Sequence, residues 1–142
     1  MVLLKVLSLN ERRPDIISSL TESLKKEDDV IFAYLYGSFA EGSPIARDID
    51  IAVYSGGVDD PFLLQANLKI MLSDALRRDN IDISPDDIDV RIINDAPYDF
   101  VIEILDKGIL LVDKDPGLRT DFIERISLLY RINEIVLQEF YR

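Results

Sequence analysis

The sequence contains no cysteine and no histidine. The absence of cysteine excludes disulfides, thiolate metal sites and cysteine nucleophiles. The absence of histidine removes the commonest general base and the commonest zinc ligand. Carboxylates are therefore the chief candidates for acid–base or metal chemistry.

Basic residues are also few: 16 Lys and Arg stand against 27 Asp and Glu, which gives a formal net charge of −11. The negative electrostatic field of a chain with this charge repels nucleic-acid phosphates and disfavours non-specific binding to DNA or RNA. A basic protein partner or a bound metal ion fits this charge better.

Long hydrophobic runs are missing as well. The opening MVLLKVLSL is apolar but short, contains Lys5 and has no small-residue cleavage signal after it. We therefore expect no signal peptide and no membrane span, and a cytoplasmic protein. The length of 142 residues and a hydrophobic content of 48% fit one core, so we expect a single domain over 1–142.

Apolar periodicity and turn residues predict alternating helices and strands. The first expected helix begins at Pro14 and ends at the charged KKEDD run, and three further helices are expected over 61–78, 97–107 and 116 to the end. The expected strands cover 30–36, 48–54, 87–94 and 109–112. This order predicts an α/β (α+β) fold with a small mixed β-sheet flanked by helices and a long C-terminal helix.

Two aspartates interrupt the apolar strand 48–54. Side chains two residues apart in a strand point the same way, so Asp48 and Asp50 share one face while Ile49, Ile51 and Val53 point into the core. Buried carboxylates are costly without a compensating charge. A positive group is therefore expected beside this pair.

The strand 87–94 repeats the pattern, with Asp87, Asp89 and Arg91 on one face. If it lies beside the strand 48–54, Asp89 completes a cluster of three carboxylates. Carboxylates so close raise one another's pKa values and oppose folding unless a divalent cation binds, and hard oxygen ligands favour magnesium or manganese.

The Gly37-Ser38 turn directly follows the first strand. A glycine lets backbone approach a phosphate closely, and a serine offers a hydroxyl and an N–H. If Ser38 also begins a short helix, the helix N-terminus favours an anion. Each of these signals is common by itself, but together they indicate a site where a triphosphate bridges the turn and the metal.

The segment YGSFAEGSPIARDIDIAVY, residues 36–54, resembles the signature of the DNA polymerase β-like nucleotidyltransferase superfamily, and specifically of the minimal nucleotidyltransferases known as MNT or MntA-type antitoxins. By position, Gly37 and Ser38 match the nucleotide-binding turn, Asp48 and Asp50 the metal-binding pair, and Asp89 the third carboxylate. Arg47 departs from the pattern, because such sequences often have serine there. It either contacts phosphate or is a tolerated surface change.

The resemblance implies that two magnesium ions on Asp48, Asp50 and Asp89 bind ATP. It further implies transfer of AMP to a tyrosine of a HEPN-domain ribonuclease toxin, with Asp89 as activator or base. Two other readings stay open: a non-catalytic subunit that neutralises its partner by contact, and a nucleotidyltransferase acting on a small molecule. The short chain argues against the second, because no extra domain is evident to enclose a small acceptor.

Overall fold

The computed structural model describes residues 9–140, so the first eight residues of the apolar opening segment lie outside the described part. The helices are α2 (Arg13–Lys25), α3 (Gly37–Ala40), α4 (Pro61–Arg78), α5 (Tyr98–Lys107) and α6 (Pro116–Phe140), with a 3-10 turn η1 (Pro85–Asp87), and the strands are β1 (Val30–Tyr36), β2 (Ile49–Ser55), β3 (Ile88–Ile92) and β4 (Ile109–Asp113). The predicted order and fold class are confirmed.

The third strand is shorter than the sequence indicates. Asp87 belongs to η1, where the Ser84 hydroxyl accepts a hydrogen bond from the Asp86 N–H at 3.3 Å. At the other end, Asn94 follows the strand but contacts β2 through its side chain: its amide oxygen accepts from the Ser55 N–H at 2.9 Å, and its amide nitrogen donates to the Ser55 carbonyl at 2.8 Å. A side-chain amide thus extends the pairing after the backbone ladder ends.

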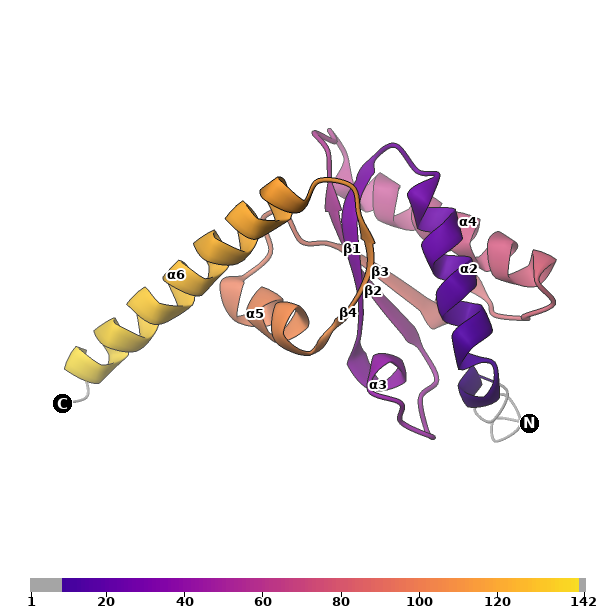
Figure 1. The fold of residues 1–142 in the computed structure, drawn as a ribbon, viewed down its shortest axis with the longest axis horizontal. Coiled ribbons are helices and arrows are strands. Elements are labelled where there is room, and N and C mark those ends of the chain that lie inside the picture. The colour runs from indigo at the N-terminus through magenta and orange to yellow at the C-terminus, as the bar shows by residue number, and fades with distance from the viewer. Residues whose placement is uncertain (1–8, 141–142) are drawn as a thin grey trace.

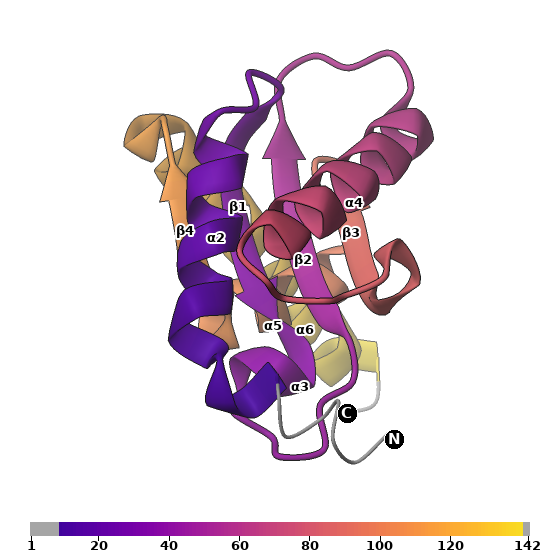
Figure 2. The ribbon, with the colours of Figure 1, turned by 90° about the vertical axis from the view of Figure 1, so that its right-hand side faces the viewer.

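The four strands form one mixed sheet in the order β3-β2-β1-β4, which Figure 2 shows behind α2 and α4. Strand β1 pairs antiparallel with β2 and with β4, whereas β2 and β3 run parallel. The two edges of the sheet are therefore β3 and β4.

Helices cover both faces of this sheet, with α2 and α4 on one side and α5 and α6 on the other (Figure 1). Ile49, Ile51 and Val53 are fully buried in the core that includes residues of α2 and α4, which confirms the predicted alternation. On the opposite face, Phe32 stacks on Tyr54 with ring centroids 4.8 Å apart.

The face toward α5 and α6 changes character along the strands. Near one end it carries the aromatic cluster of Phe32, Tyr54 and Phe122, closed by helix α6. Toward the other end the same face carries Tyr36 and Asp50. The ionisable residues therefore stand on the sheet next to the apolar core.

Helix α6 contributes only its first half to the core. Among its described residues, Phe122 and Ile126 are buried, and the second half extends beyond the rest of the fold (Figure 1). The exposed large apolar residues of this half are Leu128, Leu129, Tyr130, Ile132, Ile135, Val136, Leu137 and Phe140. Exposed apolar surface of this kind typically marks an interface.

No helix within residues 9–140 combines the length and the apolar character that a membrane crossing requires.

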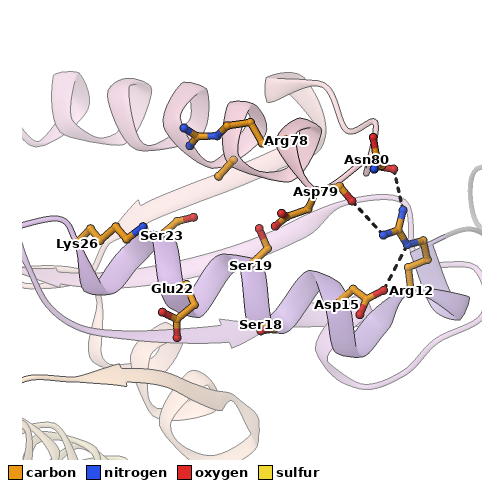
Figure 3. A pocket seen from close by; sticks show the side chains of 11 residues that line it. Arg12, Asp15, Ser18, Ser19, Glu22, Ser23, Lys26, Arg78, Asp79 and Asn80 are labelled. Carbon is orange, nitrogen blue, oxygen red and sulfur yellow. Dashed lines mark hydrogen bonds and ion pairs between the residues drawn. The ribbon is translucent and has the colours of Figure 1, made fainter.

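A polar groove lies between α2 and α4 (Figure 3). The Arg12 guanidinium spans it, donating to the carbonyls of Asn80 at 2.7 Å and Asp79 at 3.1 Å and lying 3.5 Å from Asp15. A cation at the C-terminal carbonyls of a helix stabilises that end. These contacts of Arg12 connect the start of α2 to the end of α4, so we assign the groove a structural role.

Candidate active site

Three ionisable side chains lie in register across three neighbouring strands, near one end of the sheet. Tyr36, the last residue of β1, pairs with Asp50 of β2, and Asp50 pairs with Asp89 of β3. Partners in register have their side chains on the same face and one strand spacing apart, about 4.8 Å. The expectation that the third strand lies beside the second, with Asp89 next to Asp50, is therefore confirmed.

This row places negative charges close together. Burial raises the pKa of the half-buried Asp50 above its usual value of 3.8, and the charges of Asp89 and Asp48 raise it further. Burial also raises the pKa of Tyr36 to about 12, again with added contributions from Asp89 and Asp50. The local field therefore favours a cation, as expected for a site that holds a divalent metal.

Gly37 shapes the turn that follows the row. Its φ of +78° lies in the left-handed region, and a Cβ at this position would overlap the Oδ2 atom of Asp50. Glycine is thus required both by the backbone conformation and by the approach of the carboxylate. The turn and the carboxylate consequently occupy neighbouring positions, as a shared phosphate and metal site demands.

Ser38 lies in α3, which begins at Gly37 and is a single turn of four residues. Its dipole is correspondingly small, so contacts to an anion would come from the exposed Ser38 hydroxyl and from individual N–H groups. Arg13 of α2 holds this turn in place: its guanidinium donates to the carbonyls of Phe39 and Ala40 and lies 5.3 Å from the Phe39 ring centroid.

Arg47 and Asp48 are exposed in the loop that leads into β2. The expected placement of Asp48 within the strand is therefore wrong, because β2 begins at Ile49. Asp48 acts on Asp50 through its charge. Within residues 9–140, no hydrogen bond or ion pair ties Arg47 to another side chain or to the backbone. Arg47 is therefore free to contact a ligand, and its role stays a prediction.

Asp89 has a cationic neighbour, Arg91. The strand pattern had placed Arg91 on the same face as Asp89 but had indicated no role for it. The Arg91 Nε donates to the Asp89 Oδ2 at 3.2 Å, and the guanidinium lies 5.4 Å from the ring centroid of Phe100 in α5. Phe100 in turn contacts Tyr36 edge-on, with ring centroids 5.8 Å apart. Arg91 thus neutralises part of the charge on Asp89.

The donor set suits a hard divalent cation in kind, since Asp48, Asp50 and Asp89 offer only carboxylate oxygens and lie close enough to shift the pKa of Asp50. In the described part of the chain, however, no three acidic side chains are gathered closely enough to hold a metal ion as they lie. Binding of one ion by all three therefore requires these carboxylates to move closer together, so the residues fit the ion in their chemistry but not in their present positions.

The chain belongs to the polymerase beta nucleotidyltransferase family, whose model matches residues 18–117. The match begins within α2 and ends just after the start of α6, so it covers the whole sheet and every residue of the candidate site. The fold and the site therefore define a nucleotidyltransferase domain.

Several solved structures with a similar fold are described as toxin–antitoxin complexes. One is a crystal structure of a toxin–antitoxin with AMP-PNP, 20% identical, with a TM-score of 0.66 over 88% of this chain and 94% of the other. The second is the toxin–antitoxin MntA-HepT, 22% identical, with a TM-score of 0.58 over 94% of this chain and 95% of that one.

The third is a tri-AMPylated Shewanella oneidensis HEPN toxin in complex with MNT antitoxin, 22% identical, with a TM-score of 0.58 over 95% of each chain. At these identities the likeness establishes the shared fold. A comparison with curated proteins finds no match.

Proposed function

We propose that the chain is the antitoxin of a HEPN/MNT toxin–antitoxin pair, that it acts in the cytoplasm, and that it transfers AMP from ATP to a tyrosine hydroxyl of its partner toxin. The observation that carries this proposal is the register of Tyr36, Asp50 and Asp89 beside the Gly37 turn. It combines a cation-favouring row of carboxylates with backbone that a phosphate can approach, within a nucleotidyltransferase fold.

In this reaction the tyrosine oxygen forms a bond to the α-phosphorus of ATP, and the bond from that phosphorus to the bridging oxygen of the β-phosphate breaks. Pyrophosphate leaves, and Asp89 accepts the proton of the hydroxyl. The attacking and leaving oxygens must lie in line through the phosphorus. Asp50 lies in register between Asp89 and Tyr36, the residue that precedes Gly37.

Asp48, Asp50 and Asp89 would hold two magnesium ions, with manganese as the alternative, and Gly37, Ser38 and Arg47 would contact the phosphates. When bound, such ions lower the pKa of an acceptor hydroxyl and stabilise the leaving pyrophosphate. The positive φ of Gly37 and the exposure of Ser38 and Arg47 support the assigned contacts.

A protein acceptor is supported by two observations on this chain. Its net charge of −11 suits a basic, RNA-binding partner through complementary fields, and the apolar second half of α6 offers surface for association. The structural relatives support the same view, since one of them is an MNT antitoxin in complex with a HEPN toxin that carries AMP. AMP on a toxin tyrosine would place negative charge and bulk where RNA phosphate binds.

The rival function is a non-catalytic subunit that inhibits its partner by contact. The ion pair between Arg91 and Asp89 favours this alternative, because it occupies one of the three carboxylates the reaction needs. The two functions differ in one observable: only the enzyme leaves AMP on the partner.

To test the proposal, the chain is incubated with magnesium, each nucleoside triphosphate in turn and the protein encoded beside it. The intact masses of both proteins are then measured by mass spectrometry. We expect the mass of the partner to increase by one or more AMP units with ATP, and no increase with the double variant Asp48→Asn, Asp50→Asn. An unmodified partner that is nevertheless inhibited in a tight complex would establish the contact mechanism instead.

A further inference from the structure

A groove of about 1000 Å³ lies along the outer edge of β3, with Asp89 among the residues that line it. Its other walls are the loop after β2, the first turns of α4, the connection from β3 to α5 and the start of α5. We propose that this groove binds the segment of the acceptor protein that carries the modified tyrosine, and that this segment is basic. The inference rests on the proposed function and adds the place and the chemistry of acceptor recognition.

The position of the groove follows the order of the sheet. The Gly37 turn follows β1, Asp50 is on β2, Asp89 is on β3, and the groove lies beyond β3 at the edge. In-line transfer requires the leaving pyrophosphate and the attacking hydroxyl to lie on opposite sides of the phosphorus. With the phosphates at the Gly37 turn, the acceptor must approach from the side of β3, where the groove opens.

The apolar lining suits aromatic and aliphatic side chains. Phe62, at the start of α4, is 80% exposed and lines the groove. Phe100 lies across the groove in α5 and also lines a smaller hollow of about 200 Å³ beside Gly37. A tyrosine held between these rings would reach the carboxylate row from the groove side.

The charges of the lining favour a basic segment. Arg91 is already paired with Asp89, whereas no ion pair within residues 9–140 joins Asp95 or Asp99 to a cation. Both carboxylates stand in the groove wall. Lysine or arginine residues flanking the tyrosine would neutralise them.

The groove recognises side chains more than backbone. The outward-facing N–H of Ile92 on the edge strand donates to the Gln65 amide oxygen at 3.0 Å. This donor is therefore unavailable to an added strand at that point. The acceptor segment must then be held by the aromatic and acidic walls.

The test measures initial rates of AMP transfer to the HEPN-domain protein encoded beside this chain, at varied acceptor concentration, together with the affinity for ATP. For Phe62→Ala and for the double variant Asp95→Asn, Asp99→Asn we expect the acceptor KM to rise about tenfold, with the affinity for ATP unchanged. Ile70→Ala, an exposed apolar residue elsewhere on α4, and Asp106→Asn, on α5 outside the groove, are the matched controls and should leave both quantities unchanged.

A second variant obstructs the groove without removing a contact. A Cβ at Gly57 would meet no atom within 4 Å, so Gly57→Trp places its bulk from an open position in the wall, and it should reduce transfer while ATP affinity persists. Unchanged acceptor KM in all groove variants would overturn the inference, as would a loss of ATP affinity, which would place the nucleotide there instead. Absence of transfer by the wild-type chain would overturn the proposed function itself.

Discussion

Asp50 of β2 lies in register beside Asp89 of the parallel strand β3, and the carboxylate of Asp50 fills the space where a side chain on Gly37 would stand. This relationship unites the nucleotide turn and the metal-binding carboxylates in one place. It also creates a local excess of negative charge that folding has to tolerate. Several consequences can be measured.

Replacing Asp50 with asparagine should stabilise the metal-free protein at neutral pH. Burial and the charges of Asp89 and Asp48 raise the pKa of Asp50 above 3.8, so between the unfolded and the folded pKa the folded state binds more protons. The stability of the wild type therefore falls as the pH rises through this window. Asp50→Asn should melt at a higher temperature at pH 7, with the difference shrinking toward pH 3. An equal or lower melting temperature at pH 7 would contradict the charge argument.

Gly37→Ala should destabilise the fold by at least about 1 kcal/mol, because it places a Cβ on a left-handed backbone and against the Asp50 carboxylate. Gly57→Ala is the matched control, since its Cβ has open space and its backbone is unstrained, and it should change stability by less than about 0.5 kcal/mol. Urea unfolding of both variants measures the difference. Equal stability of the two variants would show that the turn tolerates a side chain.

Asp89→Asn should lower the turnover of AMP transfer strongly while leaving much of the ATP affinity, because its assigned role is at the acceptor hydroxyl. Single-turnover kinetics report the chemical step, and calorimetry reports nucleotide binding. An equal loss of both quantities would place Asp89 on the nucleotide side of the site.

Arg91→Gln should tighten the binding of Mn²⁺ in the absence of nucleotide, because it frees the Asp89 carboxylate and removes a positive charge from the site. Arg77→Gln, a surface arginine near the end of α4, is the charge-matched control and should not change the affinity for Mn²⁺. Calorimetric titration with MnCl₂ compares them. Weaker binding to Arg91→Gln would mean that Arg91 orients Asp89 for the metal.

Much of the architecture could be predicted because it is encoded locally. The β-branched run before Gly37 gives β1, and the apolar periodicity after Pro61 gives α4, each with the bounds expected. The alternation around Asp50 and around Asp89 placed each carboxylate opposite the apolar side chains of its own strand, and the structure places the two strands side by side.

Other features depend on contacts between distant segments, which periodicity does not encode. Arg13 donates to the Phe39 carbonyl of α3, 26 positions later in the chain, and the groove at β3 combines residues of β3 with residues of the β2–α4 loop, α4 and α5. The pairing of Asp89 with Arg91 could not be predicted either, because a strand pattern indicates which face a side chain lies on but not which rotamer it adopts. For the same reason the sequence pattern could not show that the three carboxylates, as they lie in the described part of the chain, do not form a group that could hold a metal ion.

The most direct test of the central claim is the intact mass of the partner toxin after incubation with ATP, magnesium and either the wild-type chain or Asp50→Asn, with the melting temperature of each confirming its fold. We expect the wild type to add one or more AMP units to a tyrosine of the partner, and Asp50→Asn to add none. Equal addition by both proteins would contradict the assignment of the active site to the Asp50 row.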